Sequence, residues 1–298
     1  MTSNSETLRF SGHDTFHCKE QWILKGLQLI ENQNDKDVFR KDESISLLGV
    51  GKNMVRSIQY WLRAFGLIDD NVNKTEIADL LFITDKLDPY LESEGSLWLL
   101  QYLICKCGYA SIYKLIFADY FSDKATREFS EFQVFRFIDK ELRDKEQKNV
   151  AEKTLVNDYK VFIRTYVAPI KNHKTVEDDF NVPLLSLNLI SNTGRKNDYG
   201  QSVYCINKGD HNVPVEVFAY CLMTEFEDET AISFDDIRIS IGAYLCLSDD
   251  KLDMILNELA TSYKEFVFKD DAGVRQIQLK KITTTFKHDI LKKYYELY

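Results

Sequence analysis

The sequence contains few of the residues that interrupt helices or build flexible segments. Its 298 residues include only 4 prolines and 12 glycines. Long linkers and disordered tracts are therefore not expected, because such tracts are usually rich in these residues. Leucine, isoleucine, lysine and glutamate are abundant instead, and this composition favours helix. We predict a mainly α protein with short β-hairpins, divided into two or three modest domains.

Signals for the membrane, for secretion and for metal-binding cysteines are also missing. The chain has no run of about 18 uncharged apolar residues, and its N-terminus, MTSNSETLRF, lacks the regions of a signal peptide. The six cysteines form no C-x-x-C pair, so neither a zinc knuckle nor a disulfide framework is predicted. These absences predict a cytoplasmic protein with reduced cysteines.

An excess of positive charge is missing too, since the formal net charge is −9. Nucleic-acid-binding domains are usually basic, so the total argues against a general nucleic-acid binder. Electrostatic screening over about 8 Å at physiological salt means, however, that local patches decide a contact. The distribution of lysine and arginine along the chain is therefore more informative than the sum.

The stretch from Ser44 to Ile68 predicts a short helix, a tight Gly-Val-Gly turn and a second helix. Apolar residues in the second helix recur at the helical spacing and predict one buried face. They are Met54, Val55, Ile58, Trp61, Leu62 and Phe65. At about 100° per residue, a cationic stripe lies on the opposite side. We name Lys52, Arg56, Gln59 and Arg63 the first basic stripe, with Asn53 and Tyr60 flanking it.

A helix pair joined at Gly49 and Gly51, with one apolar and one basic face on its second helix, is typical of a helix-turn-helix. Such a helix rests on the core and contacts phosphates and base edges of DNA. The alternative is an ordinary amphipathic helix with a solvated basic face. Three cations neutralise about three phosphates, which gives weak binding and requires a second patch or a partner.

The segment from Lys153 to Val167 repeats the same apolar spacing and predicts a second helix-turn-helix-like unit. Its cations, Lys153, Lys160 and Arg164, form what we name the second basic stripe. The preceding amphipathic helix is expected from Glu131 to Leu142. We place a boundary between Pro169 and Pro183, and a hairpin from Leu184 to Ile206 after it.

The C-terminal part predicts the element order of a winged helix. A helix from Ser248 to Tyr263 precedes the hairpin EFVFKDDAGVRQIQLKK, and KHDILKKYYELY is a terminal helix that docks on the body or on a partner. The exposed face of the Ser248 helix is acidic through Asp249, Asp250, Asp253 and Glu258. These carboxylates repel phosphates, so this unit is expected to bind protein or to act as a scaffold. The predicted domains are 1–120 (winged-helix-like), 121–182 (helix-turn-helix-like) and 183–298 (winged-helix-like).

The opening motif SGHDTFHCKEQW offers candidate catalytic residues. Asp14 or Thr15 is a natural N-cap for the helix that follows. His13 and His17 are four residues apart, so a helix that began early enough would place both imidazoles on one face beside Asp14. Imidazole and carboxylate could bind a metal or act as a general base. The alternative is that the motif caps a helix and packs its two rings against the body.

Three motifs resemble the signature of one bacterial family, a domain of unknown function that includes the SspB-like components of DNA phosphorothioation and phage-defence gene clusters. They are SGHDTFHCKEQWILKG, LGVGKNMVRSIQYWLRAFGL and DPYLESEGSLWLL. The resemblance implies a cytosolic prokaryotic protein that acts on DNA beside a cysteine desulfurase, an ATP-pyrophosphatase-like sulfur-insertion enzyme and an ATPase. The family is also associated with strand nicking. By position, the functional residues would be His13, Asp14, His17, Gly49, Gly51, Lys52, Asn53 and Arg56.

Three hypotheses follow. The first is a DNA-binding component of a DNA modification and antiviral defence system, which contacts DNA through both basic stripes. The second is a nickase that uses His13, Asp14 and His17 with Mg²⁺ or Mn²⁺, and no other cofactor is predicted. The third is a non-catalytic adaptor. The sequence contains no independent nuclease motif, since no P-D…(D/E)-x-K or His-Asn-His pattern is present. Enzymatic activity is therefore left open.

Overall fold

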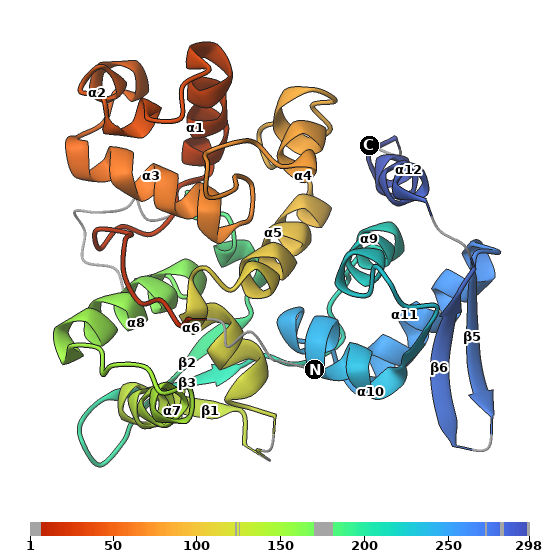
Figure 1. The fold of residues 1–298 in the computed structure, drawn as a ribbon. Helices are drawn as coiled ribbons and strands as arrows, with labels where there is room; N and C mark the ends of the chain where they lie inside the picture. The colour runs from red at the N-terminus through yellow and green to blue at the C-terminus, as the bar shows by residue number, and fades with distance from the viewer. Residues whose placement is uncertain are drawn as a thin grey trace. The chain divides into compact units, whose positions relative to one another are not determined.

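The computed structural model describes residues 7–122, 124, 126–169, 181–271, 273–280 and 283–296. It is mainly helical, with two small antiparallel three-stranded sheets (Figure 1). This confirms the predicted class. The chain forms two compact units, which we name the first unit (Met1–Glu92 with Leu103–Asn207) and the second unit (Ser93–Tyr102 with Lys208–Tyr298). No described helix is long and apolar enough to cross a bilayer.

The first unit begins with three helices that pack together and ends with a small sheet beside two further helices (Figure 1). Its helices and strands are α1 (Glu20–Gln33), η1 (Val38–Arg40), α2 (Glu43–Leu48), α3 (Lys52–Ala64), α4 (Glu76–Ala78), η2 (Asp79–Ile83), the end of α5 (Glu94–Cys107), α6 (Ser111–Lys114), η3 (Leu115–Asp119), β1 (Glu128–Ser130), α7 (Glu131–Asp144), α8 (Glu152–Tyr166), η4 (Leu185–Leu187), β2 (Ile190–Lys196) and β3 (Ser202–Ile206).

The predicted helix-turn-helix corresponds to α2 and α3. Gly49 ends α2 in the left-handed conformation, with φ of 66°, and its N–H donates to the carbonyl of Ile45 at 3.0 Å. Glycine adopts this conformation without the steric cost of a Cβ. Gly51 then provides the extended residue that precedes α3. After α3, an isolated antiparallel bridge pairs Ile68 with Lys74.

Strand β3 lies between β1 and β2, and all pairings are antiparallel. The sheet joins residues 190–206 to residues 128–130, which is why the first unit extends to Asn207. The predicted first strand at Leu184 was placed too early, because residues 185–187 form a 3-10 turn and the strand starts at Ile190. Much of the predicted boundary between Pro169 and Pro183 lies outside the described residues.

The two compact units differ from the three predicted domains, 1–120, 121–182 and 183–298. Hydrophobic periodicity identifies helices along the chain but does not show which distant segments pack together. Residues 93–102 at the start of α5 belong to the second unit, while the end of the same helix belongs to the first. A division by sequence position does not anticipate this exchange.

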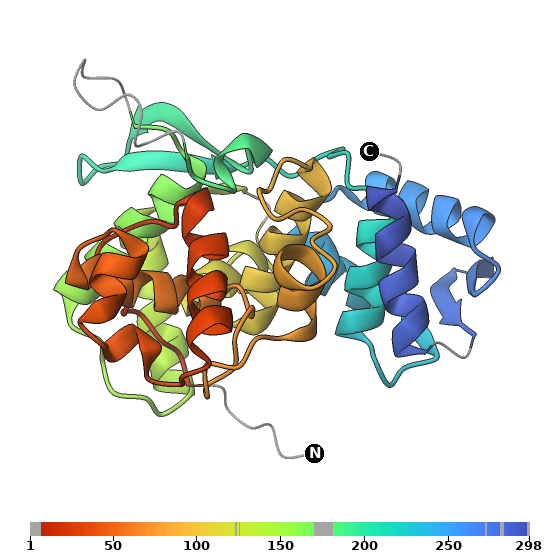
Figure 2. The same ribbon diagram turned by 90° about the horizontal axis from the view of Figure 1, so that it is seen from above.

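The second unit contains a helical layer and a sheet with strand order β4-β6-β5. Besides the start of α5, its elements are α9 (Val215–Glu225), β4 (Ala231–Ser233), α10 (Phe234–Ile237), η5 (Arg238–Gly242), α11 (Asp249–Ser262), β5 (Phe266–Asp271), β6 (Val274–Leu279) and α12 (Thr284–Tyr295). Ser233 and Ser248 cap their helices, accepting from the N–H groups of Asp236 and Lys251. The terminal helix α12 packs along α9 (Figure 2).

Candidate nucleic-acid interface

Helix α3 has the two faces that its sequence predicts. The apolar face is in the core, with Val55, Ile58 and Trp61 each at most 2% exposed. Tyr60 was predicted to flank the basic stripe, and this was wrong. It is 4% exposed, because its ring packs against His13 and Trp61 with centroid separations of 5.5 and 5.3 Å.

The first basic stripe is exposed at its N-terminal end and partly engaged at its C-terminal end. Lys52, Asn53 and Arg56 are exposed, whereas Gln59 and Arg63 are half-buried. Arg63 donates from Nη2 to the carbonyl of Asp70 at 3.1 Å. This contact holds the turn that follows α3, so part of the Arg63 side chain has a structural role.

A hollow of about 390 Å³ lies beside the first basic stripe. It is lined by Phe39, Arg40, Lys41, Asp42, Ile45, Lys52, Val55, Arg56 and Gln59. The four cations of this set come from η1, the segment after it, and α3. Lys52 and Arg56 were predicted from the sequence, whereas Arg40 and Lys41 were not. The sequence feature that could have indicated them is that they are adjacent cations just before the predicted helix-turn-helix.

Carboxylates accompany most cations of the hollow. Arg40 pairs with Asp37 at 2.9 Å, Lys52 approaches Asp42 at 3.5 Å, and Lys41 pairs with Asp35. Exposed ion pairs of this kind contribute only about 0–1 kcal/mol, so a phosphate could replace these carboxylates at small cost. Arg56 has no ion pair among the residues that the structure describes.

The second basic stripe lies on α8 and is exposed as predicted. Lys153, Lys160 and Arg164 are all exposed, and none has an ion pair within the described parts of the chain. The opposite side of α8 is core, where Leu155 and Phe162 are at most 3% exposed. The stripe therefore presents three cations to solvent from a rigid helix.

The opening motif is not helical, so the predicted shared face for His13 and His17 is wrong. Helix α1 begins only at Glu20, and its N-cap is Lys19 rather than Asp14 or Thr15. Asp14 and Thr15 instead adopt positive φ values of 46° and 66°. Gly12 has φ of 115°, and a Cβ there would lie 2.7 Å from the Tyr60 ring. The segment is a tight turn packed on α3.

His13 is buried and both of its ring nitrogens are engaged. Nδ1 accepts from the Thr15 N–H at 3.0 Å, which makes Nε2 the donor to Asp158 Oδ1 at 2.8 Å. Burial raises the pKa of Asp158, and the hydrogen bond from His13 opposes that shift. Asp158 was not predicted from the sequence. Its signal was a carboxylate on the apolar side of α8, one residue before Tyr159.

This arrangement does not fit a divalent metal. A His13 ring with one nitrogen donating and the other accepting has no lone pair left for coordination. In the described part of the chain, no group of three or more His, Cys, Asp or Glu side chains is placed to hold a metal ion. We therefore derive no chemical step through a metal from His13, Asp14 and His17, and their catalytic role stays a prediction.

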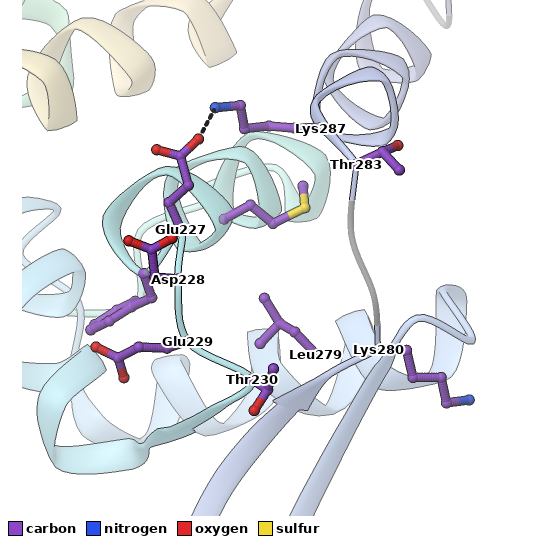
Figure 3. A pocket seen from close by; sticks show the side chains of 10 residues that line it. Glu227, Asp228, Glu229, Thr230, Leu279, Lys280, Thr283 and Lys287 are labelled. Carbon is purple, nitrogen blue, oxygen red and sulfur yellow. Dashed lines mark ion pairs between the residues drawn. The ribbon is translucent and has the colours of Figure 1, made fainter.

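A second hollow, of about 300 Å³, lies in the second unit beside the start of α12 (Figure 3). Glu227 points toward Lys287, with Nζ and Oε1 3.7 Å apart. Asp228 and Glu229 add two more carboxylates to the lining. The lining thus carries three carboxylates against two lysines, Lys280 and Lys287, a balance that does not favour a phosphate backbone.

Two solved structures have a similar fold over nearly the whole chain. One is described as "SspB crystal structure", with 24% identity and a TM-score of 0.82, covering 98% of this chain and 90% of that chain. The other is described as "Magnesium ion-bound SspB crystal structure", with the same identity and TM-score, covering 99% and 91%. No curated protein sequence matches. The family described as "Protein of unknown function (DUF4007)" matches residues 10–295, and the chain therefore belongs to that family.

Proposed function

We propose that this protein is a cytoplasmic DNA-binding component of a DNA phosphorothioate modification and phage-defence system. The observation that carries the proposal is the exposure of Lys52 and Arg56 on α3, beside a hollow that Arg40 and Lys41 also line. The second basic stripe on α8 supplies the further patch that a three-charge contact requires. DNA contact through Gly49, Gly51, Lys52, Asn53, Arg56, Gln59, Arg63, Lys153, Lys160 and Arg164 is part of this proposal.

The topology supports a winged-helix-like reading of two segments. In the first unit, α1, α2 and α3 precede the bridge between Ile68 and Lys74, which occupies the place of a small wing. In the second unit, β4 pairs with β6 of the hairpin that follows α11. A helix-turn-helix places its second helix in the major groove, which gives α3 the role of the recognition helix.

The likeness in fold to SspB, together with the family match over residues 10–295, supports the assignment to a phosphorothioation system. Within that proposal, the partners are DNA, a cysteine desulfurase, an ATP-pyrophosphatase-like sulfur-insertion enzyme and an ATPase. The acidic face of α11 is unsuited to DNA, so contacts with protein are assigned to the second unit.

The test replaces the two exposed cations of α3. Lys52→Ala with Arg56→Ala is expected to weaken binding to duplex DNA and to reduce the slope of log affinity against log salt by about two, because about two phosphate contacts are lost. Affinity is measured by fluorescence anisotropy over a series of salt concentrations. Lys140→Ala with Arg143→Ala on α7 is the matched control, since both side chains are exposed and lie outside the two stripes.

An unchanged slope in the α3 variant would refute the role of the first basic stripe. An equal loss in the α7 variant would show that only net charge matters. The experiment therefore separates a located interface from general electrostatic attraction.

The alternative function, metal-assisted nicking, is favoured by one observation on a relative, namely that an SspB structure contains bound magnesium. Under the DNA-binding proposal, supercoiled plasmid stays supercoiled in the presence of this protein with Mg²⁺ or Mn²⁺. Relaxation that is abolished both by a chelator and by His17→Ala would support the nickase instead. Relaxation that survives His17→Ala would remove this residue from the active site.

A further inference from the structure

The outer face of α11 combines negative charge with an exposed apolar side chain. Met254 is 63% exposed on this face. Asp250 and Glu258 lie one helical turn before and after it, and both are exposed. Among the described residues, neither carboxylate has an ion pair. We name Asp250, Met254 and Glu258 the α11 face. Methionine is among the residues that are enriched in protein interfaces.

Two cations near the α11 face are already engaged, and the half-buried Lys251 is the one cation on the helix itself. Arg275 pairs with Asp253 at 3.2 Å, and Lys208 pairs with Asp249 at 3.3 Å. Next to Arg275, Val274 is 62% exposed and adds a second apolar side chain near this side of the unit. A complementary surface must therefore bring cations and apolar groups of its own.

The second basic stripe has that chemistry. Its three cations are exposed on one line of α8 and have no ion pairs within the described residues. Val156 and Ile163 are half-buried along the side of the stripe. The alkyl stems of lysine and arginine also cover apolar surface while their charged ends reach carboxylates. The stripe can thus accept Met254 between Lys160 and Arg164 and pair with the flanking acids.

We propose that the α11 face of one copy of this protein binds the second basic stripe of another copy. The contact joins two different surfaces, so it is heterologous and strengthens with protein concentration. Two chains of net charge −9 repel each other, and this repulsion is strongest at low salt. Association at low salt would therefore indicate an attraction between particular surfaces. Since the stripe is also assigned to DNA, self-association and DNA binding exclude one another; only this last consequence depends on the proposed function.

Sedimentation equilibrium of the full chain tests the contact. The weight-average mass is expected to rise with protein concentration at about 50 mM salt and to return to the monomer value at about 500 mM, because screening weakens pairs between exposed charges. A wild-type chain that stays monomeric at low salt overturns the proposal.

Charge reversal identifies the two surfaces. In Asp250→Lys with Glu258→Lys, the α11 face becomes basic like the second basic stripe. In Lys160→Glu with Arg164→Glu, the second basic stripe becomes acidic like the α11 face. Each variant alone is therefore expected to be monomeric, because its two surfaces repel each other. An equimolar mixture of the two variants is expected to associate, because opposite charges again face each other. Asp139→Lys with Asp144→Lys on α7 is the control and is expected to associate like the wild type, since both acids are exposed and lie outside either face.

A mixture that stays monomeric while each variant retains its circular-dichroism melting curve overturns the pairing of these faces. Unaltered association of either single variant does so as well. A DNA duplex added to the wild type is expected to lower the mass of the protein assembly. If the duplex does not bind at all but the charge-reversal results hold, the DNA-binding function fails and the self-association stands.

Discussion

Asp158→Ala is expected to lower the free energy of unfolding by about 3 kcal/mol, because it leaves the buried Nε2–H of His13 without its acceptor. The two side chains are 5% and 3% exposed and are joined at 2.8 Å across 145 positions of the chain. Because both side chains are buried, water has little access to replace the lost hydrogen bond. Urea denaturation monitored by tryptophan fluorescence measures the change.

A double-mutant cycle tests whether the loss comes from this pair. His13→Ala is also expected to destabilise, since it leaves a buried carboxylate without its donor. The free energy of unfolding of the double variant should fall by about 1–3 kcal/mol less than the sum of the two single decreases, because neither partner is then buried without a hydrogen bond. Strict additivity would show that the hydrogen bond contributes nothing beyond the packing of each side chain.

The pH dependence of the same variant has a definite sign. Burial raises the pKa of Asp158 above its unfolded value of about 3.9, so the folded chain holds this proton to higher pH than the unfolded chain. The stability that protonated Asp158 contributes is fully present below its pKa in the unfolded chain. It is lost as pH rises through its pKa in the folded chain. The difference in unfolding free energy between wild type and Asp158→Ala should therefore shrink as pH rises from about 4. A difference that grows over this range would contradict the raised pKa.

The same pair shows how far the sequence alone can predict this protein. Helices α3, α8 and α11 follow from the spacing of their apolar residues, because burying one face is a local property of the pattern. The exposure of the second basic stripe, and of Lys52 and Arg56 in the first, follows from the same spacing. The partner of His13 cannot be predicted in this way, because a contact across 145 residues depends on tertiary packing and not on a local sequence pattern.

The opening motif fails for a related reason. The spacing of His13 and His17 fits a helix, but the backbone turns at Gly12, Asp14 and Thr15 with positive φ. Gly12 is required because the Tyr60 ring occupies the space of a Cβ, and that ring comes from α3. The contact between the opening motif and α3 thus determines the backbone conformation of the motif and overrides its predicted helical conformation.

The C-terminal helix α12 contacts the start of α5 at Gly95 and at the serines on either side of it, Ser93 and Ser96. The role of Gly95 was not predicted from the sequence. Gly95 lies in the first turn of α5, and its N–H donates to the hydroxyl oxygen of Tyr294 on α12 at 3.0 Å. Ser93 Oγ lies 2.7 Å from the same hydroxyl, and Ser96 Oγ lies 2.7 Å from that of Tyr295. The terminal helix was predicted to dock on the body or on a partner, and these contacts join it to the start of α5 within the second unit.

Gly95→Ala is expected to destabilise the second unit by about 2–3 kcal/mol, because the new Cβ would lie 2.3 Å from the Tyr294 ring and would force α12 away from α5. Thermal unfolding and limited proteolysis at the C-terminus measure the effect. Tyr294→Phe keeps the ring and should lose only about 1 kcal/mol. In a Tyr294→Ala background the clash is gone, so Gly95→Ala should be neutral or should stabilise by up to about 1 kcal/mol, as alanine favours helix over glycine. If Gly95→Ala is equally harmful in both backgrounds, the close approach of Tyr294 is not the reason for glycine at this position.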